Sequence, residues 1–133
     1  MSETEIKARE LFASGYNCAQ AVFLAVCGDM DMEFDDAARL VSAFGGGMGG
    51  TRNTCGAVSA MVLAAGHLWG YTNSKDDMAG RRKVYAKTKA MLDKFEAENG
   101  SLICRELLLE NRKTCADKVA ECVRLLQEAI AVE

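Results

Sequence analysis

The chain has 133 residues, a length that one hydrophobic core can serve, and we expect residues 1–133 to form a single domain. Hydrophobic residues make up 50% of the chain and charged residues 26%, which excludes an intrinsically disordered protein. The formal net charge is -3 and the basic residues are scattered, so the pattern excludes the basic surface of a nucleic-acid-binding protein.

Two further features predict a cytoplasmic protein without membrane insertion. No stretch approaches the roughly 20 apolar residues that span a bilayer, and residues 1–9 are charged where a signal peptide would be apolar. The chain also contains six cysteines. In a reducing compartment such cysteines are more often catalytic or ligating than part of a disulfide scaffold, so we expect the function to involve thiols.

Helical periodicity runs through the chain, which has no proline and no strong alternation of polar and apolar residues. We expect helices over about 3–27 and 34–44, followed by a loop at the glycine-rich run 45–50. Thr51 or Thr54 is expected to cap a third helix over about 55–69. This segment is almost entirely apolar and should be the most buried helix.

The second half of the chain predicts three more helices. One runs over about 74–98, with Met78 and Tyr85 among its inward-facing residues, and ends at Asn99 and Gly100. A short helix containing Cys104 follows, and Thr114 begins the last helix. The predicted fold class is all-α, a single-domain helical bundle of about four long helices plus one or two short ones.

The cysteines lie in separate predicted elements. Cys18 and Cys27 belong to the first helix, Cys55 to the start of the third, Cys104 to the short helix, and Cys115 and Cys122 to the last. No two of them form a CxxC motif, so a site must be assembled by the fold. Cys27 and Cys122 have apolar neighbours and are interpreted as core residues.

Cys55 is the most informative cysteine in the sequence. A thiol in the first turn of a helix lies near unpaired backbone N–H groups and the positive end of the helix dipole, and both lower its pKa. Arg52, three residues upstream, adds positive charge. We therefore predict that Cys55 is the most reactive thiol, with a pKa below the ordinary value.

Two other features do not predict a site. The glycine-rich run lacks the lysine and hydroxyl residue that close a phosphate-binding loop, and no strand precedes it. His67, the one histidine, lies in the apolar third helix and is interpreted as a core or helix-end residue. A hydrolytic triad is therefore not expected.

Four blocks of sequence, in order, are similar to a known family. They are residues 14–22 around Cys18, residues 44–50 with 54–57 around Cys55, residues 100–108 around Cys104, and a cysteine in the last helix. The chain resembles the redox-active four-cysteine family named C_GCAxxG_C_C for its cysteine pattern, and the resemblance covers nearly the whole chain. Ala60 stands where the family pattern has the last glycine of its central motif.

The resemblance implies a site formed by Cys18, Cys55, Cys104 and Cys115, with Cys122 as the competing choice for the fourth cysteine. It implies thiol/disulfide or electron-transfer chemistry in which Cys55 reacts and Cys18 or Cys104 resolves the intermediate, as a thiol oxidoreductase would. The alternative is a metal-binding module in which the same four thiolates hold zinc or an iron–sulfur cluster. A third interpretation is a helical interaction protein with buried cysteines. The sequence names no redox partner, and a homo-oligomer stays open.

Overall fold

The computed structural model describes residues 1–27, 31–73, 75, 78–110 and 112–132. Its elements are α1 (Glu3–Ala13), α2 (Cys18–Val26), α3 (Phe34–Val41), the 3-10 helix η1 (Ser42–Phe44), α4 (Gly56–Trp69), α5 (Met78–Asn99), α6 (Cys104–Glu110) and α7 (Cys115–Ala131). Within the described ranges, the β pairing is limited to one isolated bridge between Thr54 and Ile103. The predicted all-α fold class is confirmed.

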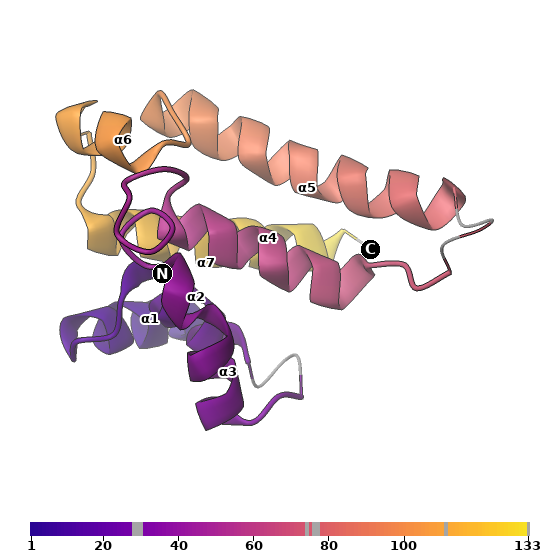
Figure 1. Cartoon of the computed structure of the whole chain (residues 1–133), viewed down its shortest axis with the longest axis horizontal. Coiled ribbons are helices and arrows are strands. Elements are labelled where there is room, and N and C mark those ends of the chain that lie inside the picture. Colours follow the sequence, from indigo (N-terminus) through magenta and orange to yellow (C-terminus); the bar gives the residue numbers. More distant parts are fainter. Residues whose placement is uncertain (28–30, 74, 76–77, 111, 133) are drawn as a thin grey trace.

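The helices pack around a core that all the longer elements share. α4, α5 and α7 run along the long axis of the molecule and contact one another, whereas α1, α2 and α3 gather on one side of them (Figure 1). Large, fully buried side chains include Phe23 of α2, Met61 of α4, Phe95 of α5 and Leu126 of α7. Burying a side chain of this size stabilises a fold by about 1.5–3 kcal/mol. None of the described helices is both long and apolar enough to cross a membrane.

The first predicted helix is two helices in the structure. α1 ends at Ala13, and Gly15 takes a φ of 117°, a left-handed conformation that glycine adopts without steric cost. Asn17 then caps α2: its side chain accepts from the Gln20 amide at 2.8 Å, and the Gln20 side chain accepts from the Asn17 amide at 3.2 Å. This capping box satisfies the first amides of α2 and starts a new helix direction. The apolar stripe predicted for one helix therefore continues across a turn.

The apolar third helix corresponds to α4, and most of its N-terminal half is buried, as expected. Neither Thr51 nor Thr54 caps it. The residue at the N-cap position is Cys55, which makes no side-chain capping bond, and the Thr51 hydroxyl instead donates to the carbonyl groups of Gly47 and Met48. Because α4 begins at Gly56, the N-cap position falls on Cys55 rather than on a threonine, and Thr51 closes the glycine-rich loop instead.

The fourth predicted helix corresponds to α5. The end at Asn99 and Gly100 is confirmed, with a φ of 87° at Gly100, whereas the predicted start at residue 74 lies outside the described residues. Met78 and Tyr85 were predicted to face inward, but both are exposed. Because α5 covers only one edge of the α4 and α7 pair, its buried stripe is narrower than the periodicity indicates (Figure 1).

Candidate functional site

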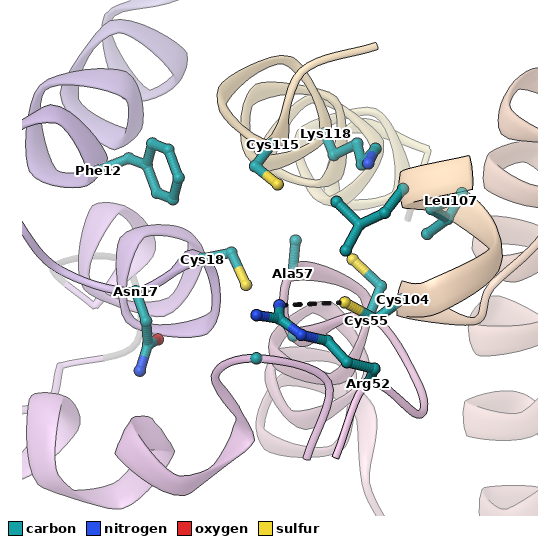
Figure 2. Close-up of a pocket in the computed structure, with 13 residues that line it drawn as sticks. Phe12, Asn17, Cys18, Arg52, Cys55, Ala57, Cys104, Leu107, Cys115 and Lys118 are labelled. Atoms are coloured by element: carbon teal, nitrogen blue, oxygen red, sulfur yellow. Dashed lines mark hydrogen bonds between the residues drawn. The ribbon is translucent and has the colours of Figure 1, made fainter. Parts of the chain in front are cut away.

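Four of the six cysteines line one cavity of about 200 Å³. They are Cys18, Cys55, Cys104 and Cys115, the set that the resemblance implied, and their side chains gather around a common space in Figure 2. Arg52 and Lys118 line the same space, which we call the cysteine cavity. Cys27 and Cys122 do not line it and belong to the hydrophobic core.

Each cysteine of the cavity stands at the start of a helix. Cys18, Cys104 and Cys115 are the first residues of α2, α6 and α7, and Cys55 is the N-cap residue of α4. Backbone N–H groups at a helix start have no partner within the helix. The fold therefore brings together both the thiols and the helix starts that carry them.

The glycine-rich loop lets α6 approach closely. Gly47 has a φ of 73°, and a Cβ atom at this position would lie 2.7 Å from the Cβ of Cys104 and 2.7 Å from the Cα of Arg52. Any side chain here would both strain the backbone and push Cys104 away. The glycine-rich run thus serves to position a cysteine.

Backbone hydrogen bonds fix Cys104 beside Cys55. The Cys55 amide donates to the Leu102 carbonyl at 2.8 Å, and the Cys104 amide donates to the Asn53 carbonyl at 2.6 Å. These bonds flank the Thr54 and Ile103 bridge, so Cys55 and Cys104 are diagonal neighbours on the same face of a short antiparallel pair. The Cα atoms of such neighbours lie about 7–8 Å apart.

Gly56 allows the sulfur of Cys18 to reach the first turn of α4. A Cβ atom on Gly56 would lie 2.6 Å from Cys18 Sγ and 2.9 Å from the Phe44 carbonyl oxygen. The glycine that follows Cys55 is therefore needed for close packing of α2 against the start of α4. This contact places Cys18 beside the residue next to Cys55.

Thr114 caps α7 and so fixes the position of Cys115, the first residue of that helix, at the cavity. The Thr114 side chain accepts from the Asp117 amide at 3.1 Å and forms a capping box. Asp117 also accepts from Arg9 Nη2 at 2.8 Å, which ties α7 to α1. Of the two candidates for the fourth cysteine, the structure places Cys115 in the cavity and Cys122 in the core.

The prediction of a low pKa at Cys55 is wrong. Burial raises the pKa of this thiol from 9.0 to about 11. The backbone amides of Val58 and Ala57 and the charge of Lys118 act in the opposite direction, as helix-start chemistry predicts, while Cys18 adds to the rise. Desolvation is the larger effect because only 6% of Cys55 is exposed.

Burial also dominates at two neighbouring thiols. It raises the pKa of Cys18, where the Gly46 amide lowers it and the charge of Cys115 raises it further. It raises the pKa of the fully buried Cys122 well above the ordinary value, with the charge of Cys55 as the next cause. Cys18, Cys55 and Cys115 line the same cavity, whereas Cys122 is fully buried in the core.

Arg52 serves a different cysteine from the one predicted. Its Nη1 atom donates to Cys104 Sγ at 3.8 Å, the contact that Figure 2 marks with a dashed line. The Arg52 backbone has a φ of 62°, which is uncommon for a residue with a side chain, and its carbonyl accepts from the Arg105 amide at 3.1 Å. Such strain persists where neighbouring bonds impose it, and here it directs the guanidinium toward the cavity.

Lys118 is a site residue that sequence reasoning missed. It is only 4% exposed, and no carboxylate or other acceptor in the described part of the chain pairs with its ammonium group. One signal was available: Lys118 follows Cys115 by three residues, so the two share a helix face, and the buried Val119 comes directly after it. Figure 2 shows its side chain between α7 and α6, at the edge of the cavity.

The thiols are free and do not form a ready metal site. All six cysteines are unpaired. Among the described residues, no three histidine, cysteine, aspartate or glutamate side chains are arranged so that they could hold a metal ion. As they stand, the four cysteines surround a space rather than a common ligand position.

Comparison with known proteins identifies the family of the chain. The model of the family described as "Putative redox-active protein (C_GCAxxG_C_C)" matches residues 16–132. A protein of Archaeoglobus fulgidus, described as uncharacterized, is 30% identical over 134 residues that cover 87% of this chain and 85% of the relative. No solved structure matches the chain. With four cysteines of the motif around one cavity and a family match over nearly its whole length, the chain belongs to the redox-active C_GCAxxG_C_C family.

Proposed function

We propose that the protein carries out thiol/disulfide exchange with the cysteines of the cysteine cavity. The observation that carries the proposal is the convergence of Cys18, Cys55, Cys104 and Cys115 on one cavity, from four helix starts, while the other two cysteines stay in the core. A helical core that needs no disulfide to fold can open and close such a bond without losing its structure.

Cys104 is the thiol that attacks. It is partly exposed, and the guanidinium of Arg52 contacts its sulfur at 3.8 Å. Its partial exposure lets a disulfide reach the sulfur, and the guanidinium can donate a hydrogen bond to the sulfur during the attack. Cys55 does not start the reaction, since it is buried and its pKa is raised to about 11. The Cys104 thiolate attacks one sulfur of a disulfide substrate, forms a mixed disulfide, and releases the other half of the substrate as a thiolate.

Cys55 resolves the mixed disulfide. Its thiol loses a proton, and its sulfur attacks Cys104 Sγ and expels the second half of the substrate, which takes up a proton as a thiol. The amides of Val58 and Ala57 and the charge of Lys118 favour the thiolate that forms during this step. The products are a Cys55 to Cys104 disulfide and two substrate thiols, so two electrons pass from the protein to the substrate.

The geometry of the Cys55 and Cys104 pair supports this assignment. Diagonal neighbours in an antiparallel pair have Cα atoms about 7–8 Å apart. A disulfide requires a Cα separation below about 7 Å, so a small shift at the start of α6 suffices.

The test is disulfide mapping by mass spectrometry. Protein purified without oxygen is treated with bis(2-hydroxyethyl) disulfide, its free thiols are alkylated, and the non-reduced peptides are analysed. We expect a Cys55 to Cys104 link, its loss in Cys104→Ser, and its retention in the matched control Cys27→Ser. Six free thiols after oxidation, together with zinc, or iron and acid-labile sulfide, bound in stoichiometric amounts, would overturn the proposal and support the alternative in which the four thiolates bind a metal or cluster.

A further inference from the structure

We propose that the cysteine cavity takes small disulfides or thiols that carry a negatively charged group, and that Lys118 binds this group. The inference rests on the proposed thiol function and names the class of substrate for the same site. It goes beyond the family resemblance, which concerns the cysteines alone.

The position of Lys118 is the main evidence. The residue is only 4% exposed, and it lines the cavity. No acceptor among the described residues pairs with its ammonium group, which is not one of the buried polar atoms and therefore reaches the cavity as a free cation. An anionic group bound in the cavity would pair with it. Lys113, which precedes α7, is the contrasting case, since it pairs with the buried Glu121 at 2.7 Å.

The other residues that line the cavity also favour a negatively charged ligand. Arg52 is the second cation, and none of the lining residues, all of which the structure describes, is an aspartate or glutamate. The starts of α2, α4 and α7 meet there, and each adds the positive end of a helix dipole. The chain as a whole has a net charge of -3, so this positive site is not a consequence of overall composition.

The size and the apolar walls limit the rest of the ligand. A cavity of about 200 Å³ accepts a small molecule and excludes the folded surface of a protein. Phe12, Leu107 and Leu108 provide apolar contacts for a short carbon chain. A substrate with sulfur, a short chain and a terminal carboxylate would place the carboxylate at Lys118 while its sulfur meets Cys104. The reaction balances as above: two protein thiols are oxidised to a disulfide and the substrate disulfide is reduced to two thiols.

The experiment compares three small disulfides of similar size but different charge. Dithiodiglycolate carries carboxylates, bis(2-hydroxyethyl) disulfide is neutral, and cystamine carries ammonium groups. The rate at which each oxidises the reduced protein is divided by its rate with free 2-mercaptoethanol, which removes differences in intrinsic reactivity. We expect the normalised rates to fall in this order, with about tenfold or more between the first and the last.

Variants assign the preference to Lys118. Lys118→Met should bring the carboxylate and hydroxyl disulfides to within about twofold of each other. Lys118→Gln should also bring the two rates together. It serves as the second variant if the fold does not accommodate methionine at position 118. Lys94→Met changes the net charge equally at an exposed residue of α5 outside the cavity, and should keep the preference.

The outcomes separate this inference from the proposed function. Equal normalised rates in the parent protein, with the disulfide still formed, would overturn the anionic substrate class and leave thiol exchange standing. A preference that survives in both Lys118 variants would overturn the role of Lys118. If none of the three disulfides oxidises the protein, both proposals fall.

Discussion

Cys55 should be protected from alkylation in the folded protein by its raised pKa as well as by its burial. The pKa rises from 9.0 to about 11, a change of two units. At about pH 7.5 the thiolate fraction of this residue then falls from about 3% to about 0.03%. Because the thiolate is the reactive form, the fold should slow alkylation about 100-fold before any steric shielding is counted.

The assay is site-resolved alkylation of the reduced protein with iodoacetamide, followed by mass spectrometry of the peptide that contains Cys55. The same peptide in urea-unfolded protein is the internal reference, since there the thiol is fully hydrated. We expect the ratio of the unfolded rate to the folded rate to be about 100 or more at about pH 7.5 and to shrink as the pH approaches 11. Folded and unfolded rates within about threefold of each other at neutral pH would refute the reasoning, because desolvation would then not control this thiol.

Three further predictions concern stability, each measured by denaturant unfolding. Gly56→Ala should lower the free energy of unfolding by about 1–3 kcal/mol, because its Cβ would lie 2.6 Å from Cys18 Sγ. The control is Gly66→Ala in the same helix, where the Cβ meets open space and the change should be neutral or stabilising. The raised pKa of Cys55 means that the fold favours its neutral thiol. The difference in the free energy of unfolding between the parent protein and Cys55→Ala should therefore be constant below about pH 9 and fall by about 1.4 kcal/mol per unit between pH 9 and 11; a difference that does not change over this range would contradict the reasoning. Lys113→Met should cost about 3 kcal/mol because it leaves Glu121, which is 2% exposed, without its cation, and the loss should shrink when Glu121→Gln is added.

The fold class could be predicted from the sequence, as could the set of cysteines that line one cavity, because both depend on local patterns. The absence of proline and the helical spacing of apolar residues fix an all-α chain. The four cysteine blocks identify which thiols belong together, and the structure places these four around one cavity. The division of the first helix was also present in the sequence, since Gly15 followed by Asn17 and Gln20 forms a turn and a capping box.

The electrostatic character of the site could not be predicted in the same way. The position of Cys55 at a helix start is a local feature, and its pKa-lowering effect is present in the structure. The opposing effect, desolvation, depends on how closely α2, α6 and α7 enclose the residue, which no sequence pattern gives. The partner of Arg52 and the burial of Lys118 likewise depend on contacts between distant segments.

The central claim is that the cysteine cavity performs two-electron thiol/disulfide chemistry. A redox titration in dithiothreitol buffers of graded potential tests it most directly, with the fraction of disulfide measured after alkylation. We predict one reversible transition in which a tenfold change in the oxidised to reduced ratio corresponds to about 30 mV, as two electrons require. The transition should vanish in Cys104→Ser and persist in Cys27→Ser. A protein whose six thiols stay reduced across the whole range, or an identical transition in Cys104→Ser, would contradict the account.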